Sequence, residues 1–199
     1  MLFAAPPFVC IILQIIFYGI SIVLNGVVLS LLIAIFNIQN HSIYTDYLTG
    51  VNNRKKLEIY LEEKISTSTE DKTFSAILID LNNFKSINDT YGHNMGDYAL
   101  QIFAKLLKNC LRSNDFIARF GGDEFCAVLD ICDRNDLEDI TWRINTCIEE
   151  YNESGTQPYK LGLSMGYAVY DYNSGMGVKE FIKEIDTLMY KNKHSFKKN

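Results

Sequence analysis

The first 40 residues form an apolar block that differs in kind from the rest of the chain. Residues 8–38 are apolar at all but seven positions, which are Gln14, Gly19, Ser21, Asn25, Gly26, Ser30 and Asn37. As one helix this run would be roughly 46 Å long, more than the ~30 Å hydrocarbon core of a bilayer. The pattern predicts one transmembrane helix within residues 1–40.

Three other interpretations of the block are weaker. A signal peptide would have a basic start and an apolar stretch about half as long. A buried core helix of this length would need a much larger protein around it. A hairpin that turns at Asn25-Gly26 stays open as an alternative, although each half would fall below the ~17 residues that a span requires.

Residues 41–199 alternate between helical and strand patterns. Apolar side chains recur at helical spacing over residues 52–65, 99–110, 137–151 and 178–189. Strands are predicted over 74–79 and 161–169, and two further apolar runs, 116–120 and 125–131, flank a glycine turn as in a β-hairpin. Helices interleaved with a hairpin predict an α/β fold of the α+β kind, a ferredoxin-like mixed sheet with flanking helices.

Charge separates the two parts of the chain and narrows the possible partners. No Asp, Glu, Lys or Arg occurs before residue 41, and the net charge of the whole chain is -5. An acidic chain lacks the broad basic face that holds a nucleic acid polymer, but it can still bind a small nucleotide. The basic residues 54–56 follow the apolar block and none precedes it, which predicts a single-pass inner-membrane protein whose larger part lies in the cytoplasm.

Two acidic positions stand at the ends of predicted strands. Asp80 follows the strand 74–79, and Asp123-Glu124 occupies the hairpin turn. If these strands are neighbours, the carboxylates meet, and carboxylate oxygens together with substrate phosphates are what Mg²⁺ prefers. Taken alone, Asp123-Glu124 also fits an ordinary solvated turn.

The segment between these acidic positions is rich in polar residues and glycine. It runs over residues 80–97 and connects a predicted strand to a predicted helix. Its backbone N–H groups and Lys85 are suited to phosphates. Asn88 and Asp97 are suited to a base edge, because a carboxylate accepts from the N1–H and N2–H donors of guanine.

The turn Gly121-Gly122-Asp123-Glu124-Phe125 matches the signature of GGDEF domains, and the chain resembles a membrane-anchored diguanylate cyclase. Residues 46–54 (DYLTGVNNR) resemble the D-x-LTGL-x-NR motif of that family. Residues 80–97 resemble its D-x-D-x-FK-x-INDTYGH-x-x-GD stretch, and residues 163–166 and 186–190 resemble its S-I-G strand and its D-x-A-L-Y helix. The resemblance covers about residues 46–197, which makes 1–40 the membrane-spanning segment and 41–199 a GGDEF domain of palm-type fold.

The resemblance implies a metal centre and a catalytic base. Asp80 and Asp123 would bind Mg²⁺, or alternatively Mn²⁺, by their carboxylates, and Leu81 would bind it by its backbone carbonyl. Asp123 or Glu124 would help to deprotonate a ribose 3′-OH. Lys85 would offset the charge that develops on the attacked phosphate.

The resemblance also implies how the substrate GTP is held. Asn88 and Asp97 would bind guanine, with His93 lining the site. The phosphates would meet the two loops and the end of the last helix, through Phe84, Lys85, Gly121, Gly122, Lys193 and Lys197. Lys197 stands where the family has an Arg and Asn82 where it commonly has an Asp, so a bidentate fork and one nearby charge are lost.

The implied reaction condenses two GTP into cyclic di-GMP with release of two pyrophosphates. Each domain would hold one GTP, so catalysis would need an antiparallel homodimer. Arg112 and Asp115 match the family's RxxD product-inhibition motif, five residues before Gly121. The alternative is a catalytically silent GGDEF module that binds GTP or cyclic di-GMP. Residues 40–46 leave little room for a dimerising coiled coil.

Overall fold

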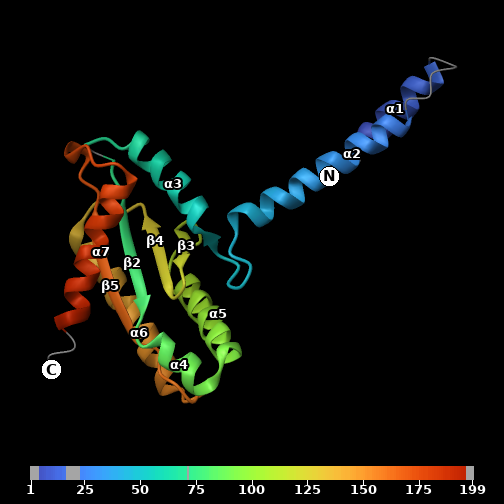
Figure 1. Ribbon diagram of the computed structural model, residues 1–199. Coiled ribbons are helices and arrows are strands. Elements are labelled where there is room, and N and C mark those ends of the chain that lie inside the picture. Colours follow the sequence, from blue (N-terminus) through green and yellow to red (C-terminus); the bar gives the residue numbers. More distant parts are fainter. Residues whose placement is uncertain (1–4, 17–22, 71, 196–199) are drawn as a thin grey trace. The chain divides into compact units, whose positions relative to one another are not determined.

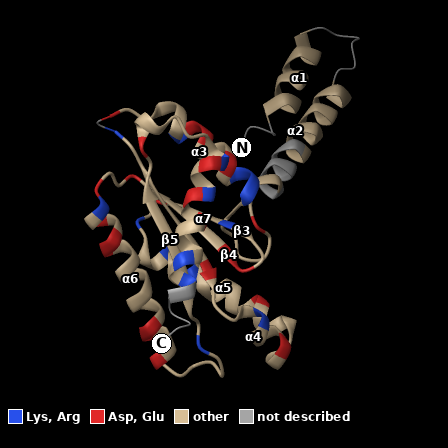
Figure 2. Cartoon of the chain, turned by 60° about the vertical axis from the view of Figure 1, so that its left-hand side comes forward, with Lys and Arg blue, Asp and Glu red and all other residues tan. Residues whose placement is uncertain are grey.

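The computed structural model describes residues 5–16, 23–70 and 72–195. They belong to two compact units, residues 1–44 and 45–199. In Figure 2 no described residue of α1 or α2 has the colour of a charged residue, whereas the helices of the second unit carry residues of both signs. The two units are described separately below.

The first unit contains two helices, α1 (Ala5–Ile16) and α2 (Val23–Tyr44), that pack against each other. A Cβ atom on Gly26 of α2 would lie 2.7 Å from the Sγ atom of Cys10 and 3.1 Å from the carbonyl oxygen of Pro6 in α1. Glycine therefore permits the close approach of the two helices. The large side chains on the other faces are exposed, Phe8, Ile15 and Leu24 among them.

The prediction of one continuous helix over residues 8–38 is wrong. Hydropathy reports that a run is apolar but not where the chain reverses, and two helices that pack on each other cannot be one straight span. The alternative turn at Asn25-Gly26 is wrong in position, because both residues lie inside α2. Among the described residues, no helix combines the length and the apolar character needed to cross a membrane.

The second unit is built on a five-stranded mixed sheet (Figure 1). Along the chain its elements are β1 (Asn52–Asn53), α3 (Arg54–Thr67), β2 (Ser75–Leu81), α4 (Phe84–Tyr91), α5 (His93–Cys110), β3 (Phe116–Gly121), β4 (Glu124–Leu129), α6 (Arg134–Glu153), β5 (Leu163–Val169), the 3-10 turn η2 (Tyr172–Ser174) and α7 (Val178–Ser195). The strand order is β1-β3-β4-β2-β5, and only the β1–β3 pair is parallel. The predicted α+β fold with a mixed sheet and flanking helices is confirmed.

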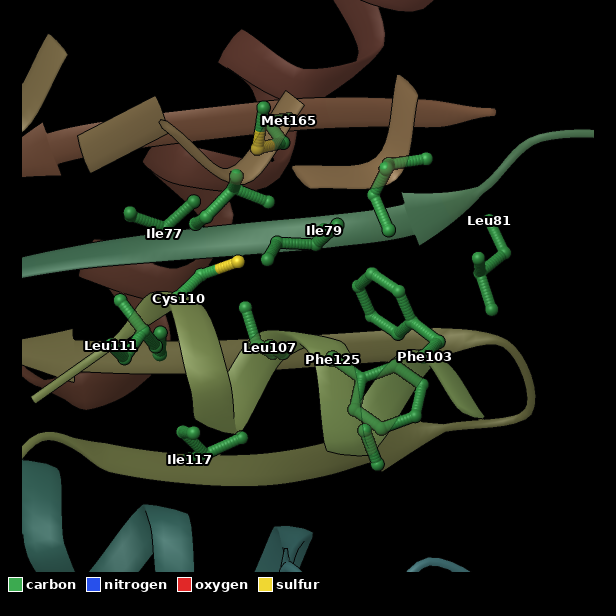
Figure 3. Close-up of a cluster of buried hydrophobic side chains, with 14 of the residues drawn as sticks. Ile77, Ile79, Leu81, Phe103, Leu107, Cys110, Leu111, Ile117, Phe125 and Met165 are labelled. Atoms are coloured by element: carbon green, nitrogen blue, oxygen red, sulfur yellow. The ribbon is translucent and has the colours of Figure 1, made fainter. Parts of the chain in front are cut away.

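Helices cover both faces of this sheet, so β2 is buried along all seven of its residues. Ile77 and Ile79 point to the face covered by α5 and α6, and Ala76 and Leu78 point to the face covered by α3 and α7. Figure 3 shows the first of these clusters, in which Phe103 of α5 meets Phe125 of β4 edge to face with ring centroids 4.9 Å apart. Cover on both faces explains why β2 is continuously apolar up to Asp80.

Helix α4 is the longest element that the sequence pattern missed; β1, at residues predicted to begin a helix, and η2 were not predicted either. Helix α4 has eight residues, and only Phe84 and Ile87 of them supply apolar side chains to the core cluster of α5 and the sheet. Two helical turns are too short to show a period. The helix begins after Asn83, whose φ of 57° is the only positive value among the described non-glycine residues. Asparagine tolerates that conformation better than most residues.

Gly166 allows α7 to pack directly on β5. A Cβ atom there would lie 2.1 Å from the carbonyl oxygen of Ile185 and 2.4 Å from the backbone nitrogen of Met189. Backbone atoms of a helix cannot move aside as the end of a flexible side chain can. The approach also fixes the position of the last turn of α7, which carries Lys193.

We expect Gly166→Ala to destabilise the protein by about 1–3 kcal/mol, the usual range for overpacking a tight contact. Gly121→Ala is the matched control, since its added Cβ atom would meet nothing closer than 4.0 Å. Urea unfolding followed by circular dichroism measures both. Equal stabilities of the two variants would contradict a specific role for the β5–α7 contact.

Candidate active site

Strand pairing brings the two acidic positions together. Asp80, the penultimate residue of β2, stands opposite Glu124, the first residue of β4. The backbone N–H of Leu81 donates to the carbonyl oxygen of Asp123 at 3.2 Å. Asp80 is only 8% exposed. The expectation that neighbouring strand ends would gather these carboxylates thus agrees with the register.

The cluster of Asp80, Asp123 and Glu124, called the acidic cluster below, is electrostatically crowded. Burial raises the pKa of Asp123 above its ordinary value and the charge of Asp80 raises it further, while Lys193 and Arg119 oppose both effects. Burial likewise raises the pKa of Glu124, as do the charges of Asp80 and Asp123. Partly desolvated carboxylates that repel one another favour a cation among them.

Asp80, Asp123 and Leu81 offer the oxygen atoms that a hard divalent cation prefers. Such a cation would take its other ligands from the phosphates of a substrate. Asp80 and Asp123 offer carboxylate oxygens, and Leu81 offers a backbone carbonyl next to Asp80. In the part of the chain that the structure describes, no group of three or more Asp, Glu, His or Cys side chains could hold a metal ion by itself. Mg²⁺ is commonly held by one or two carboxylates, with phosphate oxygens and water as its other ligands.

Lys193 reaches the acidic cluster from α7. Its Nζ atom lies 2.5 Å from Oδ1 of Asp80 and donates a hydrogen bond to it. Lys193 was predicted to bind phosphate, and the structure pairs it with a predicted metal ligand. Lys197, predicted to act beside it, lies outside the described residues.

Arg119 fixes the turn that carries Asp123, and sequence reasoning missed it. Its Nε and Nη2 atoms donate to the carbonyl oxygen of Gly122 at 2.9 and 2.7 Å, and its Nη1 atom lies 3.3 Å from both carboxylate oxygens of Asp46. A signal was available, because Asp46 opens the motif at residues 46–54 and Arg119 stands just before the glycine turn.

Asp46 is in turn held by Thr49, whose backbone N–H and hydroxyl donate to it at 2.9 and 2.6 Å. Burial alone would raise the pKa of Asp46, but these hydrogen bonds and the charge of Arg119 outweigh burial and lower it. The charged carboxylate is therefore the form that the fold stabilises, and it keeps Arg119 in place.

Helices α4 and α5 bring together the residues predicted to bind guanine. A Cβ atom on Gly96 would lie 1.9 Å from Oδ1 of Asn88 and 3.2 Å from Cζ of Phe84, so both side chains lie against the start of α5. Asp97 is the next residue of α5 and is exposed. Space left by Gly96 thus places Asn88 and Phe84 beside Asp97.

Four other predicted substrate residues are exposed, and one of them lies at the start of α5. His93 is its first residue, Lys85 is the second residue of α4, and Gly121 and Gly122 form the hairpin turn; all four are exposed. Asn82 has a structural role. Its Oδ1 atom accepts a hydrogen bond from the hydroxyl of Ser164 at 2.7 Å, and its backbone N–H donates to the carbonyl oxygen of Gly162 at 2.8 Å. It ties the loop after β2 to β5.

The RxxD residues lie at the other end of β3 from the glycine turn. The backbone N–H of Arg112 donates to Oδ2 of Asp115 at 2.7 Å. Both residues line a cavity of about 340 Å³ together with Lys108, Thr45 and residues 50–52. Ile117 of β3 also lines the cavity, so residues 117–121 separate it from the turn by roughly 13 Å along the strand.

Some curated relatives of the chain are named diguanylate cyclases, and one is named a cyclic di-GMP phosphodiesterase. The chain is 29% identical over 154 residues to the diguanylate cyclase DosC of Escherichia coli K12, covering 77% of this chain and 34% of that protein. It is 29% identical over 149 residues to the cyclic di-GMP phosphodiesterase NbdA of Pseudomonas aeruginosa, covering 74% of this chain and 19% of that one. The chain thus spans at most about a third of the length of these relatives.

Solved structures share the fold. The diguanylate cyclase SiaD of Pseudomonas aeruginosa, crystallised with its activator SiaC, superposes with a TM-score of 0.70 at 26% identity, over 80% of this chain and 61% of that chain. The family model described as "Diguanylate cyclase, GGDEF domain" matches residues 43–199. Together with the register of the acidic cluster, this match shows that the chain belongs to the GGDEF domain family.

Proposed function

We propose that the protein is an active diguanylate cyclase that condenses two GTP into cyclic di-GMP and two pyrophosphates. The observation that carries this proposal is the acidic cluster, in which Asp80 stands opposite Glu124 and beside Asp123. A silent module would not need to keep three crowded, partly desolvated carboxylates. The family's diguanylate cyclase name and the homologue DosC support the same activity.

Each condensation forms one bond and breaks one. The 3′-oxygen of one GTP attacks the α-phosphorus of the other, its proton passes to Asp123 or Glu124, and the bond to pyrophosphate breaks. A second identical step closes the ring. When bound by Asp80, Asp123 and the carbonyl of Leu81, Mg²⁺ or Mn²⁺ supplies Lewis acidity and orients the phosphates.

In this proposal the guanine of GTP binds at one end of the site and its phosphates bind at the other. Asn88 and Asp97 bind guanine with His93 at the rim. The phosphates lie along Phe84, the exposed turn Gly121-Gly122 and the lysines Lys85, Lys193 and Lys197. The position of Asn88 and Phe84 against Gly96 supports this arrangement, since it leaves Asp97 exposed beside them.

One domain holds one GTP in this scheme, so the active form is an antiparallel homodimer. Product binds at Arg112 and Asp115 and inhibits the enzyme. The cavity of about 340 Å³ at these residues, which also presents Lys108, supports an anionic ligand there. Guanidinium groups suit both guanine and phosphate.

Membrane attachment through residues 8–38, with the second unit on the cytoplasmic side of the inner membrane, is part of the same proposal. Its support is the absence of charge before residue 41 and the exposed apolar side chains of α1 and α2. Exposed apolar surface of this extent is costly in water and favourable in lipid.

Incubation of the full chain in detergent with GTP and Mg²⁺ should yield cyclic di-GMP, detected by chromatography. Asp123→Ala should lower the rate by about 10²–10⁴-fold, since it removes a metal ligand and a candidate base. Asp139→Ala, an exposed carboxylate of α6, is the matched control and should keep full activity. Nucleotide binding without product in the unaltered protein would instead identify a silent module.

In metal-free buffer, Asp123→Asn should be more stable than the unaltered protein at neutral pH. The folded-state pKa of Asp123 is raised above the unfolded value of about 3.9, so stability is lost as the pH rises through the folded pKa. The asparagine avoids this loss. Thermal unfolding in EDTA should show a higher Tm for Asp123→Asn, and this difference in Tm should shrink as the pH falls toward 4. A difference in Tm that does not depend on pH would contradict the prediction.

Arg112→Ala should relieve product inhibition without slowing the first turnovers. Arg134→Ala, a salt-bridged arginine on the exposed side of α6, is the matched control and should retain inhibition. Initial rates with increasing added cyclic di-GMP measure both. Equal inhibition of the two variants would exclude the RxxD cavity as the regulatory site.

A further inference from the structure

The ammonium group of Lys193 lies where the proposed function requires a metal cation. Its Nζ atom is 2.5 Å from Oδ1 of Asp80, and the two side chains are 33% and 12% exposed. A charge-assisted hydrogen bond between partly buried groups is stronger than an exposed ion pair. The protein itself thus compensates the charge of Asp80.

Lys193 is also the movable positive charge of this site. Burial and the charge of Asp80 raise the pKa of Asp123, and the two cations Lys193 and Arg119 oppose that rise. The guanidinium of Arg119 is bound to Gly122 and Asp46. A lysine on its flexible four-carbon stem can exchange partners, whereas a guanidinium held at three nitrogens cannot do so without moving the turn.

Contacts of neighbouring residues hold the backbone near Lys193, so its position does not depend on the Lys193–Asp80 bond. The Nδ2 atom of the preceding residue, Asn192, donates to the carbonyl oxygen of Met165 in β5 at 2.9 Å. One turn earlier, Met189 lies against Gly166. The ammonium can therefore leave Asp80 by rotation of its own stem, without displacement of α7.

A metal and this ammonium compete for the same carboxylate. Mg²⁺ binds oxygen at about 2.0–2.1 Å and tolerates little departure from octahedral geometry. We infer that Lys193 is a resident counter-ion that a divalent metal must displace from Asp80, and that the displaced ammonium is then received by the triphosphate. This inference rests on the proposed function, because it takes Asp80 as a metal ligand.

The consequence is a coupling between metal and nucleotide. Metal alone must break the Lys193–Asp80 pair without offering the ammonium a new partner, so its affinity is reduced. With nucleotide present, the phosphates accept hydrogen bonds from the ammonium of Lys193, and the lost metal affinity is recovered. Metal and nucleotide therefore bind cooperatively, each raising the affinity for the other by the same factor.

The test is a titration of the full chain in detergent with Mn²⁺ alone, followed by the paramagnetic resonance signal of free Mn²⁺. Lys193→Met should bind Mn²⁺ about five- to tenfold more tightly than the unaltered protein, within the usual range of coupling between sites. Lys193→Gln should do the same. Lys191→Met, which removes an equal charge from an exposed position two residues earlier, is the matched control and should change the affinity less than twofold.

The titration is repeated with a non-hydrolysable GTP analogue at saturation. The analogue should tighten Mn²⁺ binding strongly in the unaltered protein and much less in both Lys193 variants. Circular dichroism shows that each variant is folded. Unchanged or weaker Mn²⁺ affinity in both Lys193 variants, or equal effects at Lys191, would overturn the inference.

The outcome separates this inference from the cyclase proposal. Tighter Mn²⁺ binding in the Lys193 variants, with no cyclic di-GMP from the unaltered protein, would support the counter-ion and refute the enzyme. Cyclic di-GMP formation by the unaltered protein, with unchanged Mn²⁺ affinity in the Lys193 variants, would support the enzyme and refute the counter-ion. A lysine that only binds phosphate would alter affinity for the analogue and leave Mn²⁺ binding without nucleotide as it was.

Discussion

The register between β2 and β4 is the constraint on which the candidate site depends. Side chains alternate between the two faces of a strand, so a slip by one residue would exchange the α5/α6 core with the α3/α7 core. Both cores consist of closely packed apolar side chains, which makes that slip very costly. The same register places Asp80 opposite Glu124. Apolar burial along the whole of β2 thus fixes where the carboxylates lie, and hydrogen bonds at the site make only small adjustments to their positions.

Local bonds do set the glycine turn. Arg119 and Asp46 are 16% and 14% exposed, and the guanidinium joins Asp46 to the carbonyl oxygen of Gly122. Removal of one member of a largely buried ion pair typically costs about 3–5 kcal/mol, because the other charge is left uncompensated. A turn rich in glycine would otherwise sample many conformations. The ion pair therefore restricts the conformation of the turn that carries Asp123.

Much of this arrangement could be predicted from the sequence, and the exceptions have physical causes. Apolar patterns predicted β2 and α6 to within three residues at each end, since burial itself creates those patterns, but α5 begins six residues before its predicted start and α7 ends six residues after its predicted end. Helix α4 was missed because two turns hold too few apolar positions. A reversal within the apolar block was an open alternative, but its predicted position at Asn25-Gly26 is wrong because both residues lie inside α2. The motifs named Lys193, but its pairing with Asp80 depends on a helix 113 residues away in the chain.

The position of Asp46 has a mechanical consequence. Thr45 alone separates it from Tyr44, the last residue of α2, and Asp46 is bonded to the arginine that holds the glycine turn. The bond is short-ranged and geometrically demanding, so a small strain would be felt as a shift of the turn. A displacement of residues 45–50 would therefore change the position of Asp123 relative to Asp80.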